Sequence, residues 1–362
     1  MISEQGTYKL LLHGIDTVQC AYYLTPPASK HLDFRALAVI KEQLRMSKSR
    51  EPRAVMLGGT EFFIYPYGSS SGYPFVLSNE DFKIELGEFN NPSCFVTFRS
   101  QALWRHSALT LHDKFLAWAK SVGCEMQQPE SLSRVDFCFD YSLAERNFDA
   151  DSFVSFSDKD SQHRQNGTVQ TFTLGKGDVV LRVYDKIAEI RQQSAKVWFH
   201  ELWGQDEHVW RIEWQVRKPI LRGFLIRTFA ELQERQGALL KFLAEHHDTL
   251  RIRTEDSNRS RWPLHPLWID LQERIAVLHS LETKQIDGKE LVLDERLMRL
   301  TISIYGYLQR MAAVSCVKQE QEMMTEEEAY RLLGNRLGRL FDPLTWKADV
   351  RKRMKAIELG EW

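Results

Sequence analysis

The sequence predicts an α+β protein in which an antiparallel β-sheet with flanking helices is followed by a helical C-terminal region. Runs that alternate polar and apolar residues recur up to residue 217, whereas apolar residues at helical spacing dominate afterwards. The 362 residues also exceed the usual size of a single hydrophobic core, so a second domain or a large appendage is expected.

Strands and two helices are expected in the first third of the chain. The helices are Phe34–Met46 and Ala108–Val122, in which apolar residues recur on one face. Gly68–Gly72 is rich in glycine and serine, and so short a segment suits a surface hairpin loop better than a domain boundary. The predicted strands are Tyr8–Leu12 leading into Val18–Leu24, Ala54–Tyr65 interrupted by Gly58-Gly59, Phe82–Leu86 and Phe95–Phe98.

Three later segments, Arg134–Asp140, Leu181–Lys186 and Trp210–Arg217, carry polar side chains at alternate positions. Successive side chains of a strand point to opposite faces, so the apolar residues of each segment would enter a core. If these strands share a sheet, its other face holds carboxylates, a tyrosine and several cations, which is more typical of an enzyme than of a scaffold. The polar set is Arg134, Asp136, Asp140, Arg182, Tyr184, Lys186, Arg211, Glu213, Gln215 and Arg217.

A β-hairpin is predicted from Val169–Leu174 and Val179–Lys186, joined by Gly175-Lys176-Gly177. We interpret the glycines as the hairpin turn. A phosphate-cradling loop is the less favoured alternative, because neither a GxxxxGK[ST] pattern nor a following helix is present.

The chain after Arg217 is predicted to be helical, with breaks at Pro263 and Pro266. Its tail from Arg331 to Lys355 is basic, and this charge suits either a solvated helix face or contact with phosphates. The predicted helices are Leu221–His246, Leu267–Ser280, Asp294–Ala313 and Glu326–Leu340.

Composition excludes several classes of protein. The 48 Lys+Arg and 49 Asp+Glu give a net charge of -1, which argues against a uniformly basic surface but allows a local basic groove. Five widely spaced cysteines without a CxxC pair indicate neither a disulfide framework nor a zinc knuckle, and they suit a reducing cytoplasm. No apolar run is long enough to span a bilayer and no signal peptide is evident, so a cytoplasmic protein without a membrane partner is expected.

Tyr184 is the candidate nucleophile. A phenol is a weak nucleophile near neutral pH, so attack on phosphorus requires cations or an assisting base, and Arg182 and Lys186 flank it on the same face. Asp136 and Glu213 come from different strands and each follows an arginine by two residues, and spacing alone favours cross-strand ion pairs over a site for Mg²⁺ or Mn²⁺. Asp140 is either a third ligand or the polar end of its strand.

The three polar-faced segments resemble the replication initiation factor family of rolling-circle plasmids and phages, and relaxases of some conjugative elements are similar. The matching strings are Ser133-Arg-Val-Asp-Phe-Cys-Phe-Asp140, Phe172–Gly177 with Leu181–Glu189, and His208–Arg217. A weaker match follows at Asn258, Arg261, Trp262 and Trp268, and the resemblance extends from about Gly14 to Leu281. The order and spacing of the motifs make the set fairly specific.

This resemblance implies a DNA nickase that starts rolling-circle replication of a phage, plasmid or integrative element. Residues 1–281 would form the catalytic domain. Residues 282–362 lie beyond the resemblance, and their basic tail alone suggests a helical region that contacts DNA. Tyr184 would form a 5′-phosphotyrosyl bond, Arg182, Lys186 and Arg211 would stabilise the added charge, and Asp136, Glu213 and Asp140 would hold Mg²⁺ or Mn²⁺. Expected partners are single-stranded or cruciform origin DNA, a host helicase and a second copy of the chain. The DNA contacts are assigned to Arg134, Lys176, Arg217, Arg261 and Trp262.

Two alternatives stay open at this point. The first is a non-catalytic DNA-binding protein of a mobile element, which would use the sheet and the basic tail for phosphate contacts. The second is a metal-dependent nuclease in which water attacks and Tyr184 only packs. Base stacking on Trp104, Trp210 or Trp262 is also conceivable, although core packing is the favoured role of each tryptophan.

Overall fold

A computed structural model describes residues 8–25, 32–47, 51–165, 167–194, 196, 198–278 and 288–358. The chain divides into two compact units, residues 1–155 with 159–286 and residues 156–158 with 287–362. The first unit carries the β-sheets and their helices. The second carries three helices, α9 (Gly288–Gln319), α10 (Glu326–Leu340) and α11 (Pro343–Glu358). The catalytic and DNA-contacting roles assigned to 1–281 and 282–362 stay predictions.

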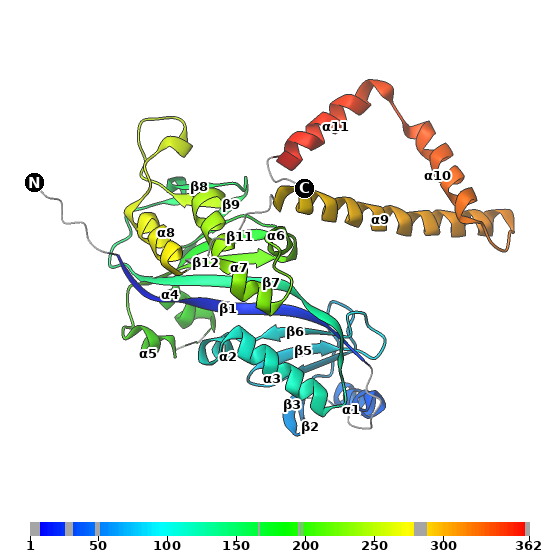
Figure 1. Cartoon of the computed structure of the whole chain (residues 1–362), viewed down its shortest axis with the longest axis horizontal. Helices are drawn as coiled ribbons and strands as arrows, with labels where there is room; N and C mark the ends of the chain where they lie inside the picture. Colours follow the sequence, from blue (N-terminus) through cyan, green and yellow to red (C-terminus); the bar gives the residue numbers. More distant parts are fainter. Residues whose placement is uncertain are drawn as a thin grey trace, which may run out of the picture. The chain divides into compact units, whose positions relative to one another are not determined.

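An antiparallel sheet of 11 strands forms the first unit, which confirms the predicted α+β class (Figure 1). Its strand order is β2-β3-β4-β5-β6-β1-β7-β12-β11-β10-β9, and β8 (Phe153–Ser155) pairs with β13 (Asp248–Leu250) in a second, two-stranded sheet. The strands of the large sheet are β1 (Lys9–Leu24), β2 (Arg53–Leu57), β3 (Thr60–Ile64), β4 (Phe75–Ser78), β5 (Phe82–Leu86), β6 (Cys94–Phe98), β7 (Met126–Ser142), β9 (Asp160–Gln165), β10 (Thr168–Leu174), β11 (Val179–Asp185) and β12 (Val209–Arg217).

The long strands β1 and β7 run side by side through the middle of the sheet (Figure 1). The sequence predicts two separate runs where β1 is one strand of 16 residues, because several register shifts against β7 absorb the irregular stretch between them. Gly14 lies within it, and a Cβ there would come within 2.7 Å of the Trp104 ring. The glycine therefore allows helix α2 (Ser100–Arg105), which carries Trp104, to approach the strand.

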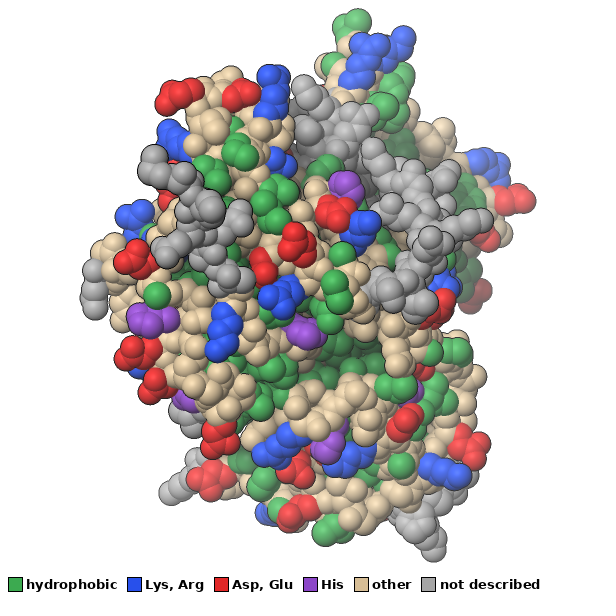
Figure 2. Space-filling view, turned by 60° about the vertical axis from the view of Figure 1, so that its left-hand side comes forward, with side chains coloured by type: hydrophobic (Ala, Val, Ile, Leu, Met, Phe, Trp, Pro, Cys, Tyr) green, Lys and Arg blue, Asp and Glu red, His purple; other side chains and the backbone are tan. Residues whose placement is uncertain are grey.

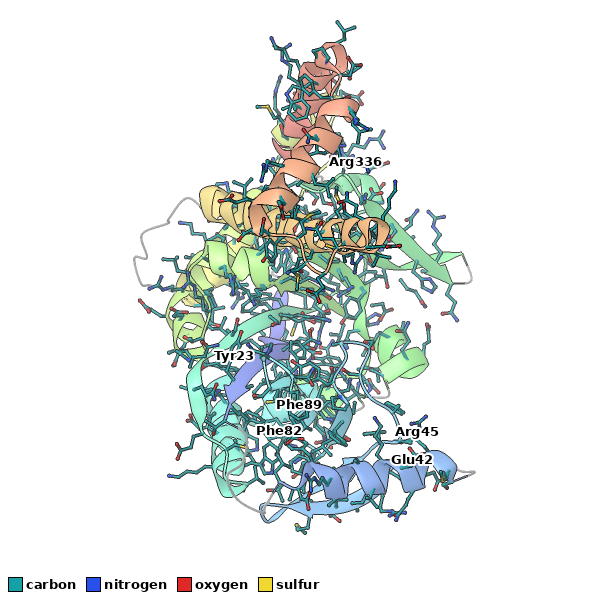
Figure 3. All side chains as sticks on the ribbon, turned by 90° about the vertical axis from the view of Figure 1, so that its right-hand side faces the viewer. Tyr23, Glu42, Arg45, Phe82, Phe89 and Arg336 are labelled. Atoms are coloured by element: carbon teal, nitrogen blue, oxygen red, sulfur yellow. The ribbon has the colours of Figure 1, made fainter. Side chains whose placement is uncertain are left out.

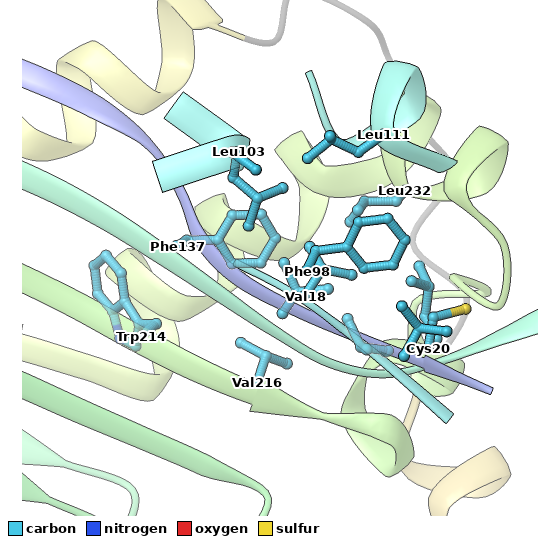
Figure 4. Packing of buried hydrophobic residues seen from close by; sticks show 14 of the residues in the cluster. Val18, Cys20, Phe98, Leu103, Leu111, Phe137, Trp214, Val216 and Leu232 are labelled. Carbon is cyan, nitrogen blue, oxygen red and sulfur yellow. The ribbon is translucent and has the colours of Figure 1, made fainter. Parts of the chain in front are cut away.

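One face of the sheet is apolar and packs under α3 (Ala108–Ser121), α7 (Phe229–Phe242) and α8 (Pro266–Leu278). Ring contacts join strands to helices at centroid distances of 4.3 Å for Tyr22 and Phe115 and 5.7 Å for Trp214 and Trp268. Figure 4 shows further members of this core, and Val135, Phe137 and Phe139 lie in it as their alternation predicts. The core therefore fixes which face of β7 is polar.

The polar face is covered near its centre. Helix α4 (Lys186–Glu189), a π-helical turn at Ile190–Ser194 and α5 (Phe199–Trp203) follow β11 and bring Phe199 and Trp203 into a second, smaller apolar cluster. The polar residues beneath are buried, although an exposed sheet face was the expectation from sequence.

Several predicted helices agree with the structure, including α1 (Phe34–Met46) and α10, whereas Leu221–His246 is not a single helix. There α6 (Lys218–Gly223) ends, Leu225 adopts a positive φ of 56°, and α7 starts anew after Thr228. Thr228 and Glu231 form a reciprocal capping box that defines this new start. The remaining short helical segments are Ala150–Ser152, Leu243–His247 and Arg259–Arg261.

Charges of both signs are interspersed over the face of the molecule seen in Figure 2, in keeping with the balanced composition. The basic tail lies on α10 and α11, where Arg336, labelled in Figure 3, is exposed. Among the described residues, no helix is long and apolar enough to cross a membrane.

Candidate active site

Strands β7, β12 and β11 are neighbours in one sheet, which meets the condition that the sequence left open. Tyr184 of β11 lies opposite Arg211 of β12, which lies opposite Asp140 of β7. Arg182 lies opposite Glu213 in the next row. Because directly opposed residues of antiparallel strands share a face, these side chains project together.

The Tyr184 hydroxyl donates a hydrogen bond to Glu213, with 2.9 Å between Oη and Oε2. The other oxygen of Glu213 accepts from Arg182 at 3.3 Å, and Lys186 Nζ lies 3.5 Å from the Tyr184 hydroxyl. The tyrosine is 8 % exposed, in a polar cluster rather than among the apolar side chains of the core. A phenol, a carboxylate and two cations thus meet at one point.

The Tyr184 phenol is protonated in the resting protein. Burial raises the pKa of Tyr184 well above its usual value, Glu213 raises it further, and Arg211 opposes the shift. A reaction of this oxygen as a nucleophile therefore needs a proton acceptor. The Glu213 carboxylate already holds the hydroxyl proton in a hydrogen bond.

Lys186 is buried at the start of α4, and its Nζ donates to Glu189 Oε2 at 2.6 Å. The ammonium lies 5.4 Å from the ring centroids of Tyr184 and Phe199. Burial lowers the pKa of Lys186, and Arg211 lowers it further. Glu189 was not singled out from the sequence, although its place three residues after Lys186 on a helix suits an ion pair.

Arg211 is fully buried and holds two acids. Its Nε and Nη2 donate to the two oxygens of Asp140 at 2.6 and 2.8 Å, and Nη1 donates to Asp16 at 2.9 Å. Trp203 Nε1 also donates to Asp140, at 2.9 Å. Every donor group of Arg211 and both oxygens of Asp140 thus have a partner in this arrangement. These bonds hold the pair in place at the base of the site, and the predicted roles of Arg211 in stabilising the added charge and of Asp140 as a third metal ligand stay predictions.

Asp16 is the residue of this network that sequence reasoning missed. It also accepts hydrogen bonds from Ser100 at 2.8 Å, Trp104 at 3.2 Å and Lys196 at 3.2 Å. Burial raises its pKa, but Arg211 and Lys196 outweigh burial and hold the pKa of Asp16 well below its usual value. The signal available in the sequence was only that Asp16 is the one acidic residue of β1.

Asp136 lies two rows from Asp140 on β7 and pairs with Arg134, whose Nε is 2.7 Å from Oδ1 and whose Nη2 contacts Oδ2. Burial nevertheless raises the pKa of Asp136 to about 6, because Glu213 and Asp16 add to burial while Arg134 opposes it. Both acids thus have an ion-pair partner. The pair of Glu213 with Arg182 is cross-strand, as expected, whereas Asp136 pairs with Arg134 of its own strand.

The raised pKa of Asp136 predicts a dependence of stability on pH. A carboxyl whose pKa is higher in the folded state stabilises the fold below about pH 4, and this contribution is lost as the pH rises through 6. The loss is about 3 kcal/mol at most, from a shift of roughly two pKa units. Urea unfolding of the full chain between pH 4 and 7 should show it, and Asp136→Asn, which stays neutral, should lack it. An equal pH dependence in the Asn variant would contradict the assignment.

The acidic side chains of the site fit a divalent cation only in part. Among the described residues, no group of three or more acids, histidines or cysteines is arranged to hold a metal. After burial, repulsion from Glu213 contributes to the raised pKa of Asp136, and a cation held by the two carboxylates would relieve this repulsion. Mg²⁺ is commonly held by one or two carboxylates with water and substrate phosphate, so these two acids suit such a site without Asp140.

Three of the predicted DNA contacts lie near one end of these strands. Arg217 of β12 is exposed and lies opposite Arg134 of β7, whose side chain is 25 % exposed. Lys176 is exposed in the turn between β10 and β11, and the Arg217 amide donates to the carbonyl of Asp178 in the same turn at 2.8 Å. The glycines around Lys176 thus form the predicted hairpin turn.

The other two predicted contacts, Arg261 and Trp262, lie in the segment after β13. Arg261 is exposed and lies 3.6 Å from Asp256. Trp262 is 6 % exposed, its ring is stacked by Arg259, and its indole donates to the Asp256 carbonyl at 2.7 Å. The tryptophan thus has the packing role that was the alternative to base stacking.

Comparisons with known proteins identify no family for this chain. No protein-family model matches the chain, and no curated protein does. A similar solved structure is that of a rolling circle replication initiator protein from Geobacillus stearothermophilus, with a TM-score of 0.42 and 18 % identity over 76 % of this chain and 99 % of that chain. At this TM-score and identity the similarity carries no conclusion about activity.

Proposed function

We propose that the protein nicks and rejoins a DNA strand at an origin, through a 5′-phosphotyrosyl bond on Tyr184, to start rolling-circle replication of a mobile element. The observation that carries the proposal is the hydrogen bond of 2.9 Å from the Tyr184 hydroxyl to Glu213, with Lys186 at 3.5 Å. A buried tyrosine commonly has an acceptor at its hydroxyl, as Tyr141 has in Asp270, but Tyr184 has a buried ammonium beside its hydroxyl as well.

The reaction exchanges one phosphoester bond for another. The phenol proton passes to Glu213 as the Tyr184 oxygen bonds to phosphorus, and the bond from phosphorus to the 3′ oxygen breaks. The leaving oxygen takes a proton and becomes a 3′ hydroxyl. Because a phosphodiester is replaced by another phosphoester, a 3′ hydroxyl can reverse the step and rejoin the strand without ATP.

Cations near the reacting oxygen stabilise the added negative charge. Lys186 lies next to the phenolic oxygen, and Arg182, whose side chain is 33 % exposed, can reach a bound phosphate from the edge of the site. Arg211 lies next to Tyr184 in the sheet, acts through its charge, and holds Asp140 and Asp16 in position. Such preorganised charge is commonly the largest contribution to catalysis.

Asp136 and Glu213 are the residues that would hold Mg²⁺ or Mn²⁺. When bound, the ion supplies Lewis-acid polarisation of a phosphate oxygen. Glu213 would then have to serve both the cation and the phenol, which its two oxygens allow.

The test is a single-stranded origin oligonucleotide labelled on the 3′ side of the cleavage site, incubated with the full chain and Mn²⁺ and run on a denaturing gel. The proposal predicts a labelled band that migrates with the protein and disappears with excess chelator. Cleavage without such a band would favour the nuclease in which water attacks, an alternative supported by the deep burial of Tyr184. Tight binding with no cleavage would favour the non-catalytic DNA-binding protein.

Glu213→Gln is predicted to slow cleavage by about 10²-fold or more, because an amide accepts no proton from the phenol. The measurement is the single-turnover rate at saturating DNA. Glu85→Gln is the matched control, since Glu85 is also 8 % exposed on the same sheet and pairs with a cation, Lys83. Equal rates for the two variants would remove Glu213 from the mechanism.

Partners other than DNA, namely a host helicase and a second copy of the chain, stay predictions. So does contact between DNA and the basic helices α10 and α11.

A further inference from the structure

The polar face continues past Tyr184 onto the last two strands of the sheet. Thr171 of β10 lies opposite Tyr184, and His163 of β9 lies opposite Thr171. Opposed residues share a face, so this row leads from the phenol to the edge of the sheet. A second row runs beside it through Arg182, Thr173 and Ser161. We name Ser161, His163, Thr171 and Thr173 the hydroxyl platform.

The hydroxyl platform is accessible, unlike the centre of the polar face at Arg211 and Asp140. Every residue of β9 is exposed, and Thr171 and Thr173 are partly exposed. Between them, Phe172 points to the opposite face and is 2 % exposed in the core. In Figure 3 the β9–β10 hairpin, in green, projects from the side of the sheet.

Among the described residues, 8–25, 32–47, 51–165, 167–194, 196, 198–278 and 288–358, none of the four side chains makes a hydrogen bond or an ion pair. Two of them, Thr171 and His163, continue the row of Tyr184, and Thr173 and Ser161 continue the row of Arg182. Hydroxyl side chains are common donors to phosphate oxygens of nucleic acids.

The row of Tyr184 is blocked on one side and open on the other. On the β12 side it continues into Arg211 and Asp140, which are 0 % exposed. The ring of Phe199 covers that side, with its centroid 4.5 Å from the Arg211 guanidinium. On the β10 side the row reaches the partly exposed Thr171 and the exposed His163, so a strand bound at Tyr184 can extend over β10 and β9.

We infer that single-stranded DNA next to the cleaved phosphate lies on the hydroxyl platform, with Thr171, Thr173 and His163 donating to its backbone phosphates. The inference deepens the proposed function and rests on it for the place of the cleaved phosphate. The contacts are to the backbone, so they hold the strand in register without reading its sequence.

The test uses Thr171→Val with Thr173→Val, which removes both hydroxyls and keeps the β-branched shape that suits a strand. The full chain carrying Tyr184→Phe is titrated into a fluorescein-labelled single-stranded oligonucleotide of mixed sequence, and anisotropy gives the dissociation constant. We expect about tenfold weaker binding, the size of effect for lost hydrogen bonds to a charged group. The slope of log K against log salt should stay unchanged, because no cation is lost.

The matched control is Arg164→Gln, on the other face of the exposed strand β9. Because its side chain projects from the opposite face, it should leave both the dissociation constant and the salt slope unchanged. If Arg164→Gln weakens binding and the double threonine variant does not, the hairpin attracts DNA through its charge and not through the hydroxyls. That result would overturn the inference. Unchanged binding in the double threonine variant would also overturn it, and would leave the free edge of β9 to pairing with another protein strand.

The failure of the proposed function is distinguishable from that outcome. If the native chain forms no covalent band but the threonine variant binds DNA about tenfold more weakly, the platform stands and the nickase does not. If the band forms at the native rate and affinity in the threonine variant, the nickase stands and the platform does not.

Discussion

Tyr184→Phe is expected to abolish the covalent protein–DNA band and to lower the rate of strand cleavage by about 10⁴-fold or more, the order of loss for removal of a covalent nucleophile. Phenylalanine retains the ring but has no oxygen to attack phosphorus. DNA affinity should change little, because the hydroxyl faces Glu213 and Lys186 in the resting protein. Single-turnover cleavage and the anisotropy titration measure the two effects separately.

Tyr141→Phe provides the matched control for this prediction. Tyr141 is a buried tyrosine on the neighbouring part of the sheet, and its hydroxyl also donates to a carboxylate, that of Asp270, at 2.9 Å. Its loss should affect stability and leave cleavage intact. Cleavage by Tyr184→Phe at the native rate would show that water, and not Tyr184, attacks phosphorus. Tyr184 would then be a packing residue.

Arg211→Met is expected to destabilise the protein by about 3–5 kcal/mol, because it leaves the acids of Asp140 and Asp16 buried without their cation. Arg211 is 0 % exposed and makes three hydrogen bonds of 2.6 to 2.9 Å to them. The measurement is the midpoint of urea unfolding of the full chain, followed by tryptophan fluorescence.

Two further variants test whether the loss of stability comes from the unpaired buried acids. Arg211→Met combined with Asp140→Leu should recover much of the stability, since an apolar pair of similar size replaces a buried ion pair at small cost. Arg45→Met should change stability by less than about 1 kcal/mol, because Arg45 and Glu42, labelled in Figure 3, form an exposed ion pair. Similar losses for Arg45→Met and Arg211→Met would contradict the buried network.

The alternation of the sequence was enough to predict which side chains share a face. It assigns Val135, Phe137 and Phe139 to the core and Asp136 and Asp140 to the polar face, and the structure agrees. Faces follow from the two-residue period of a strand, which is local in sequence.

Partners within the site could not be predicted, because they depend on strand order and register. The arginine nearest to Glu213 in sequence is Arg211, yet Arg211 binds Asp140 and Asp16, and Glu213 binds Arg182. The bond between Arg211 and Asp16 joins residues 195 positions apart. No motif marks Asp16 in the sequence. It belongs to the site because β1 pairs with β7 in the sheet.

Strand β9 was missed for a different reason. All six of its residues are polar and exposed, so no alternation marks it as a strand. Its structure comes from pairing with β10, whose Phe172 and Leu174 are anchored in the core. Context and not local pattern decides such an edge strand.

The most direct test of the nucleophile is mass spectrometry of the covalent protein–DNA complex after digestion with protease and nuclease. The proposed function predicts a nucleotide attached to the peptide that contains Tyr184, through its phenolic oxygen and a 5′ phosphate. A nucleotide on any other residue, or a cleaved strand with no nucleotide on the protein, would contradict it.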